Sequence, residues 1–286
     1  MVLPLSPLSR TWERGLGVRG VRAKIEYRKS NIENRPVPAV IMAGGTAKPE
    51  MVAATGLTNR ALVPIDGKPM LSHVVEALRG AACVEGITVI GDLPDSPDYA
   101  RVADQGGFVE NLFAGLEACQ GAEYALVSTA DIPFIGAEIV NDFVRNGAAM
   151  GADVVYPVVR VEECYRRFPG VKRTAVSLRD GKLTGGNMVL MRPAFMRAQR
   201  TRIEEAYGAR KSPIRLALML GLSTTFRAAL AFTVAPSLLS VARLESAVGR
   251  LLGGTARAYI SPFPEIATDI DRPSDLEAIT GRPSEG

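Results

Sequence analysis

The sequence predicts an α/β fold, with a mostly parallel twisted sheet sandwiched by helices and a helical insertion in the C-terminal half. Segments typical of strands and of helices alternate from Val37 onward, which is the pattern of a parallel sheet. Two of the apolar, strand-like runs break sharply, one into Gly44-Gly45 and the other into Asp131 just before Pro133. The carboxyl ends of parallel strands are the usual place for ligands, so these breaks predict a site as well as a fold.

The expected elements follow from short apolar runs, helical spacing and turn residues. Short apolar runs bounded by turns predict strands at 37–42, 61–65, 86–90, 124–128, 154–159 and 256–260. Apolar residues at helical spacing predict helices at 70–78, 107–119, 135–146, 194–207, 214–222, 225–234, 238–252 and 274–279. The Asp180-Gly181 turn predicts a hairpin of 171–178 and 183–191, and residues 46–59 are expected to form a long loop.

Residues 37–280 are expected to form a single domain, within which 214–252 is a helical insertion. Residues 1–36 lack a sustained period and are expected to be a disordered extension, and 281–286 are a short tail. The longest apolar stretch, 228–242, is short and contains Pro236, so no transmembrane segment is expected. Peripheral membrane contact and a homodimer contact through this stretch remain open.

The composition excludes several classes of function. The chain has 286 residues, of which 47% are hydrophobic and 22% charged, as in a globular protein. The net charge of +4 is modest, and four of the basic residues, Arg10, Arg14, Arg19 and Arg22, lie in the extension, so nucleic acid binding is not expected. Three widely spaced cysteines fit a reducing, cytoplasmic location. The single histidine, His73, removes most histidine-based catalysis and cannot anchor a zinc site alone.

Two motifs point to phosphate and metal chemistry. In Ala43-Gly44-Gly45-Thr46 the glycines let backbone N–H groups approach a phosphate chain, although a structural turn is the simpler interpretation. The run matches neither a P-loop nor a G-x-G-x-x-G fingerprint. Asp131 at a strand end offers a hard oxygen ligand for Mg²⁺. Arg60 precedes an apolar run, and its fork suits phosphate oxygens, whereas Lys68 is better explained as a solvated cation.

The order of these parts resembles the MobA-like NTP transferases, a family of nucleotidyltransferases of the GT-A, or nucleotide-diphospho-sugar transferase, type. Four runs carry the resemblance between about Val37 and Thr280: Ala43-Gly44-Gly45, Arg60 to Leu71, Asp131-Ile132-Pro133, and Asp269 to Leu276. Each run is weak alone, but four in this order are fairly specific. Two features depart from the family. Arg60 stands where a lysine is usual, and the loop after Gly45 is longer, with Lys48 as its only cation.

The resemblance implies a role for each candidate residue. Asp131 and Asp271 would hold Mg²⁺, with Asp269 as the second choice to Asp271. Ala43, Gly44, Gly45 and Thr46 would bind nucleotide phosphates, Arg60 and Lys48 would neutralise them, and Gly106 and Gly107 would contact the base or ribose. Gly186, Asn187 and Arg173 would lie near the acceptor. Simpler roles stay open: a helix cap for Asp131, turns for Asp269 and Asp271, a helix start at Gly107, and a bulge at Gly186.

The expected reaction is Mg²⁺-dependent transfer of NMP from an NTP to a small phosphorylated acceptor, with release of pyrophosphate. One alternative is a glycosyltransferase on the same fold, which would want an Asp-x-Asp at the third strand, where this chain has Asp131-Ile132-Pro133. The other is a non-catalytic module that binds a nucleotide or sugar nucleotide.

Overall fold

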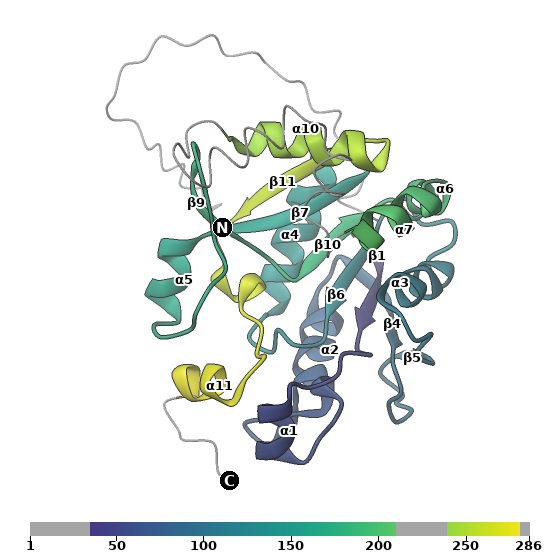
Figure 1. The fold of residues 1–286 in the computed structure, drawn as a ribbon. Coiled ribbons are helices and arrows are strands. Elements are labelled where there is room, and N and C mark those ends of the chain that lie inside the picture. The colour runs from purple at the N-terminus through teal and green to yellow at the C-terminus, as the bar shows by residue number, and fades with distance from the viewer. Residues whose placement is uncertain (1–34, 210–238, 281–286) are drawn as a thin grey trace, which may run out of the picture.

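The computed structural model describes residues 35–209 and 239–280, and these form a nine-stranded sheet with helices on both faces (Figure 1). Its strand order is β5-β4-β1-β6-β10-β7-β9-β8, with β11 paired to β7. The strands are β1 (Val37–Met42), β4 (Val84–Ile90), β5 (Ala100–Val102), β6 (Ala125–Thr129), β7 (Val154–Arg160), β8 (Val176–Leu178), β9 (Gly181–Gly185), β10 (Met188–Met191) and β11 (Ala256–Ser261). Strands β5, β4, β1 and β6 are mutually parallel, as are β7 and β11, while β8, β9 and β10 pair antiparallel.

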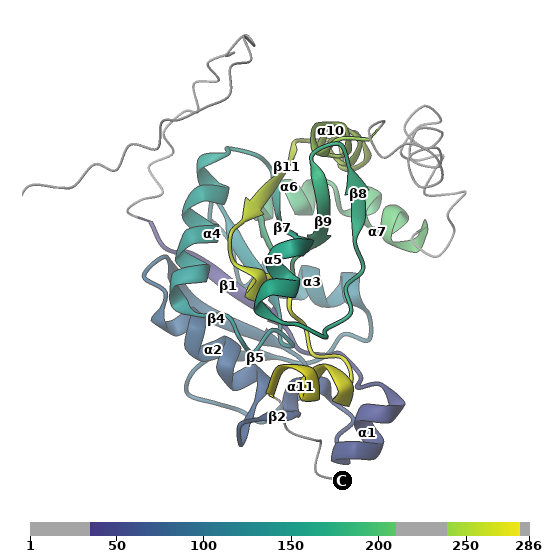
Figure 2. The ribbon, with the colours of Figure 1, turned by 90° about the vertical axis from the view of Figure 1, so that its left-hand side faces the viewer.

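The helices divide between the two faces of the sheet (Figures 1 and 2). Helices α2 (Met70–Gly80), α4 (Ala137–Ala149) and α5 (Val161–Arg167) share one apolar core with the odd-numbered residues of β1. Helices α3 (Phe108–Glu117), α6 (Pro193–Ala198) and α7 (Arg200–Ala209) share the core of the opposite face with Val40. Helix α10 (Val241–Leu252) packs against β11 and α7. The alternation of side chains along each strand explains why one strand supplies both cores.

A smaller apolar cluster closes the end of the molecule at which the site lies. It joins α1 (Pro49–Thr55) to α11 (Pro273–Thr280), which Figure 2 shows side by side. The cluster also takes Val63 and Ile65, which follow the 3₁₀ turn η2 (Arg60–Leu62) and lead into the hairpin of β2 (Pro64–Ile65) and β3 (Lys68–Pro69). A second 3₁₀ turn, η4 (Pro264–Ala267), leads from β11 toward α11. The buried Ile270 belongs to this cluster and anchors the segment before α11.

The sequence-based expectation for residues 46–65 was wrong in two places. The expected long loop contains helix α1, which has Pro49 at its start, Glu50 in its first turn and Gly56 as a left-handed C-cap. The expected strand at 61–65 begins as the 3₁₀ turn η2, because the Asn59 side chain accepts a hydrogen bond from the backbone N–H of Ala61 at 2.9 Å. Within 61–65, only Pro64 and Ile65 form a strand, β2.

Further differences lie elsewhere in the chain. The turn at Asp180-Gly181 joins β8 to β9 as expected, but the expected strand 183–191 is split by a two-residue shift in its register with β7. The expected helix 194–207 is two helices, which meet at Gln199. Strand β5 and helix α5 were not expected. The expected extension 1–36, the helices 214–222 and 225–234 and the tail 281–286 lie wholly or almost wholly outside the described residues.

Candidate functional site

The chain segment after β1 forms a tight loop held by backbone hydrogen bonds. The backbone N–H of Arg60 donates to Gly45 O at 3.0 Å, and that of Ala47 donates to Thr58 O at 2.8 Å. The Asn59 side chain donates to Ala43 O at 3.0 Å. Ala43 itself is 1% exposed and bonded to Ile90 O, so it supports the loop from below rather than facing a cavity. Gly44, Gly45 and Thr46 line the cavity above it.

That first cavity, here called the nucleotide cavity, has a volume of about 580 Å³, which suits a small-molecule ligand. Its walls bring together most of the residues expected to bind nucleotide. It is lined by Met42, Gly44, Gly45, Thr46, Arg60, Asp92, Asp104, Gly106, Gly107, Phe108, Asn111 and Thr129. Gly107 is also the N-cap of α3, so its simpler role as a helix start holds as well.

Asp104 and Asn111 are residues of this cavity that the sequence reasoning missed. The Asp104 carboxylate accepts from the backbone N–H of Gly106 at 2.7 Å and from the Asn111 side chain at 3.0 Å. Asn111 Oδ1 in turn accepts from the backbone N–H of Gln105 at 2.7 Å. This network fixes the loop before α3. The available signal was an Asp two residues before a glycine, which is common turn chemistry.

Three carboxylates meet beside the nucleotide cavity. Asp131 follows β6, and Asp269 and Asp271 lie between η4 and α11. One carboxylate oxygen of each lies within 4.8 Å of the others. The two segments are tied together by the backbone N–H of Ile270, which donates to Asp131 O at 2.9 Å. Three hard oxygen donors at this spacing could hold a divalent metal ion such as Mg²⁺.

Two cations engage these carboxylates. Arg60 bridges Asp131, with an Nη2 to Oδ2 distance of 2.7 Å, and Asp271 through its other terminal nitrogen. Lys48 Nζ lies 2.7 Å from the second oxygen of Asp271. Both cations expected from sequence are therefore at the site, although they contact carboxylates here.

Asp131 is the most buried member of the group, at 4% exposed. Burial raises the pKa of its carboxyl above the ordinary value, although Arg60 and the Thr129 hydroxyl act in the opposite direction. A cation that binds here must compete with a proton, so its affinity rises with pH. Asp131 does not cap the helix that follows, because the N-cap of α4 is Gly136.

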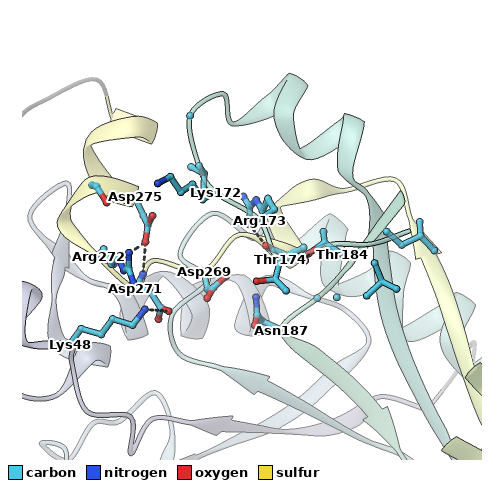
Figure 3. A pocket seen from close by; sticks show the side chains of 18 of the residues that line it. Lys48, Lys172, Arg173, Thr174, Thr184, Asn187, Asp269, Asp271, Arg272 and Asp275 are labelled. Carbon is cyan, nitrogen blue, oxygen red and sulfur yellow. Dashed lines mark hydrogen bonds and ion pairs between the residues drawn. The ribbon is translucent and has the colours of Figure 1, made fainter. Parts of the chain in front are cut away.

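On the other side of the carboxylates lies a second cavity, here called the acceptor cavity, of about 710 Å³ (Figure 3). It contains the expected Gly186, Asn187 and Arg173 together with Lys48, Asp269 and Asp271. Arg60 lines the nucleotide cavity, and it bonds to Asp271, which lines the acceptor cavity. The ion-paired group therefore lies between the two cavities.

Gly186 and Asn187 form the bulge between β9 and β10. A Cβ on Gly186 would lie 2.9 Å from Pro157 Cγ and 3.2 Å from Ile266 O, so only glycine fits there. The backbone of Asn187 bonds both to Thr129 N and to Ile266 O, which links β6 to the segment that carries Asp269. The bulge interpretation is therefore correct in structure, and the same bulge places Asn187 in the cavity wall.

Asp275 holds Asp271 in place from the first turn of α11. Its carboxylate accepts from the backbone N–H of Asp271 at 3.2 Å and of Arg272 at 2.9 Å. Asp275→Ala should lower the free energy of unfolding by about 1 kcal/mol, the usual cost of a lost helix cap. We expect Mg²⁺ affinity to fall as well, and the neighbouring Ser274→Ala to change neither. Unfolding curves and metal titrations would check this, and unchanged Mg²⁺ affinity in Asp275→Ala would contradict it.

Gly44 is a second position at which structure predicts a large effect. A Cβ there would lie 2.3 Å from Asp104 Oδ2 and 3.1 Å from Asn111 Nδ2. Gly44→Ala should therefore displace the network beside the nucleotide cavity and cost about 1–3 kcal/mol of stability, with weaker nucleotide binding. Gly208→Ala is the matched control, because a Cβ there meets no atom within 4 Å. Equal melting temperatures for the two variants would contradict the assignment.

The remaining chemistry of the described residues offers no competing site. Burial raises the pKa of the Cys83 and Cys119 thiols to about 11, so neither is a nucleophile at neutral pH. Lys68 pairs with the exposed Glu76 at 2.7 Å, away from the site. Among the described residues, no helix combines the length and apolar character needed to cross a bilayer.

Comparison with known proteins identifies the family and the fold. A search of the curated proteins found no match. A structure titled as a hypothetical transferase from Thermus thermophilus is 36% identical, with a TM-score of 0.74, over 85% of this chain and 99% of that one. The fold is shared with the 4-diphosphocytidyl-2C-methyl-D-erythritol synthase of Anaerococcus prevotii, at 11% identity and a TM-score of 0.51 over 87% of this chain and 97% of that one.

The fold is also shared with the bifunctional IspDF of Campylobacter jejuni, at 10% identity and a TM-score of 0.52 over 86% of this chain and 54% of that one. A sequence-family model described as the MobA-like NTP transferase domain matches residues 39–219. That range holds the glycine loop, Arg60, Asp131 and the Gly186-Asn187 bulge. The chain belongs to the MobA-like NTP transferase family, whose members are nucleotidyltransferases.

Proposed function

We propose that the protein transfers NMP from an NTP to a phosphate-bearing acceptor with release of pyrophosphate, and that the reaction depends on Mg²⁺. The observation that carries this proposal is the position of Asp131, Asp269 and Asp271 between the nucleotide cavity and the acceptor cavity. An ion held there would be near both reactants. Residues 37–280 would form the catalytic domain.

The donor set fits Mg²⁺, which prefers carboxylate oxygens and leaves positions for phosphate oxygens and water. Asp131 and Asp271 would hold it, with Asp269 as a further ligand. When bound, the ion would neutralise charge on the triphosphate. The three side chains approach from two segments that backbone hydrogen bonds already fix, so the site needs little rearrangement.

Arg60 and Lys48 balance the carboxylates in the ligand-free protein. We propose that both turn toward the triphosphate when nucleotide binds. Arg60 already lines the nucleotide cavity, and its planar fork can hold two phosphate oxygens at once. The N–H groups of the Gly44-Gly45 loop would take the remaining oxygens.

An oxygen of the acceptor phosphate would attack the α-phosphorus. The bond from the α-phosphorus to the bridging oxygen breaks, and pyrophosphate leaves with that electron pair. The acceptor phosphate needs no general base, because it is already an anion. Positioning and charge stabilisation by Arg60 and Lys48, with Lys172 in the wall of the acceptor cavity, would supply the catalysis. This suits a chain with one histidine.

Pyrophosphate release from each of the four NTPs, with a panel of phosphomonoesters, tests the proposal. We expect release with one or two NTPs, dependence on acceptor and loss of activity with EDTA. Nucleotide binding without pyrophosphate release would favour the non-catalytic module, and turnover of NDP-sugars would favour the glycosyltransferase. The described cysteines are buried free thiols, which agrees with a reducing cytoplasm as the place of reaction.

A further inference from the structure

The acceptor cavity adjoins a third, apolar cavity of about 310 Å³, here called the apolar groove. The two cavities share part of their walls: Tyr156, Val176, Leu183, Thr184 and Gly185 line both. The groove therefore begins where the acceptor cavity ends, on the face of the sheet that α10 covers. A ligand in the acceptor cavity would therefore lie beside the groove.

The walls of the groove are almost entirely hydrocarbon. Strands β7, β8, β9 and β11 and helix α10 supply Val154, Val158, Val176, Leu178, Leu183, Val241, Leu244, Val248, Ala256 and Ala258. The two charged residues of the wall, Glu245 and Arg257, lie 3.5 Å apart. Glu245 also accepts the backbone N–H of Ala258 at 2.8 Å. Their charges are thus engaged, and the groove offers little to a polar ligand.

The two faces of β7 differ in how well they are covered. On the face toward α4, Val155 and Val159 are fully buried. On the groove face, Val154 and Val158 are only half-buried, and so is Leu244 on α10 across from them. Val248, one turn further along α10, is exposed. An apolar surface that the described residues leave partly uncovered is typical of a site that binds an apolar group.

The acceptor cavity, which adjoins the groove, has cationic side chains that suit an anion. Lys172 is exposed at the acceptor cavity and forms no ion pair with any described residue. The Nε of Arg173 is buried without a hydrogen-bond partner among the described residues, while its other nitrogens hold Ala267 O and Thr268 Oγ1. Figure 3 shows both side chains in the wall of the acceptor cavity. A phosphate placed there would lie near Asp269 and Asp271.

We propose that the acceptor is an amphipathic phosphomonoester. Its phosphate would lie near Lys172 and Arg173, and its hydrocarbon tail would pass Tyr156 and Leu183 into the apolar groove. This inference rests on the proposed function and specifies its substrate class. The product would be a nucleoside diphosphate esterified to a lipid-like alcohol, formed by the bond changes described above.

Binding of alkyl phosphates without nucleotide tests the groove by itself. Isothermal titration with methyl, butyl and octyl phosphate, below micelle-forming concentrations, should show affinity that increases with chain length. We expect octyl phosphate to bind at least about tenfold more tightly than methyl phosphate, because each buried methylene adds favourable transfer energy. Octanol should bind weakly, since it lacks the charge that Lys172 and Arg173 would hold. Affinity independent of chain length would overturn the inference.

Leu244→Trp, which fills the groove, should remove the chain-length dependence, while the volume-conserving Leu244→Met should keep it. If Leu244→Trp does not fold, Val248→Trp at the exposed rim gives the same test. An unchanged preference for octyl phosphate in a folded Trp variant would overturn the proposal. So would a Trp variant that only alters self-association, because the groove would then hold a second copy of the chain.

The outcome is separable from that of the proposed function. Pyrophosphate release with short and long phosphates at equal efficiency would leave nucleotidyl transfer standing and refute the amphipathic acceptor. Tail-dependent binding with no pyrophosphate release from any NTP would support an amphipathic phosphate ligand and refute nucleotidyl transfer. Release that becomes more efficient with chain length, and loses that trend in Leu244→Trp, would support both.

Discussion

Asp131→Ala is expected to abolish Mg²⁺-dependent pyrophosphate release while leaving the fold intact. Asp131 is the buried member of the carboxylate group, and under the proposed function its loss would remove one of three oxygen ligands. A loss of at least about 10³-fold in turnover is expected, similar to the loss of a major electrostatic group in other enzymes. Steady-state kinetics with saturating nucleotide would measure it.

The melting temperature, unlike the activity, should not fall when the charge of Asp131 is removed. Burial disfavours the charged form of Asp131, so Asp131→Asn should melt at the same temperature as the parent or higher, while activity is lost. Asp142→Asn on α4, where the carboxylate accepts a hydrogen bond from the Tyr259 hydroxyl of β11, is the control that should keep activity. Mg²⁺-dependent turnover in Asp131→Ala would remove this residue from the site.

Arg60→Ala is expected to have the second largest effect. Nucleotide binding should weaken by about 2–5 kcal/mol, the usual cost of truncating one partner of a largely desolvated charge pair. The ligand-free protein should also lose on the order of 2 kcal/mol of stability, because Asp131 and Asp271 lose the hydrogen bonds that bridge them. Addition of Mg²⁺ should restore more stability to this variant than to the parent, since the ion replaces the missing positive charge.

Two further variants separate charge from shape. Arg60→Lys should recover part of the nucleotide affinity, because the charge remains but the fork does not. Arg79→Ala removes an arginine from the exposed pair with Asp98 and should change neither property. If Arg60→Ala bound nucleotide like the parent, Arg60 would serve only to balance the carboxylates, and the non-catalytic module would become the better account.

The core of the fold could be predicted because its strands carry strong local patterns. The apolar runs of β1, β4, β6 and β7 are nearly continuous, and each is bounded by turn residues. Helix α1 was missed because its seven residues give too few turns to show a period, although Pro49 and Gly56 mark its ends. The split between β9 and β10 depends on the close packing of Gly186 against Pro157, which is a tertiary contact.

The site could be predicted in part for a related reason. Gly44, Gly45 and Asp131 stand at strand ends, so the topology alone brings them to one edge. The pairing of Asp131 with Asp271, 140 residues later, rested on family resemblance rather than on any local pattern. Asp104 and Asn111 were missed because their role is a network across a loop, which spacing does not reveal. The apolar groove is formed by four strands and a helix from distant parts of the chain, so no single segment of the sequence predicts it.

We propose that Asp131, Asp269 and Asp271 hold the ion through which this protein recognises a nucleotide. One binding measurement tests this proposal without knowledge of the acceptor. Isothermal titration with the α,β-methylene analogue of each NTP would be carried out with Mg²⁺, with EDTA and with Asp131→Asn. We expect one analogue to bind the parent in Mg²⁺, with affinity at least about tenfold lower after either change. Equal affinity under all three conditions would contradict the account.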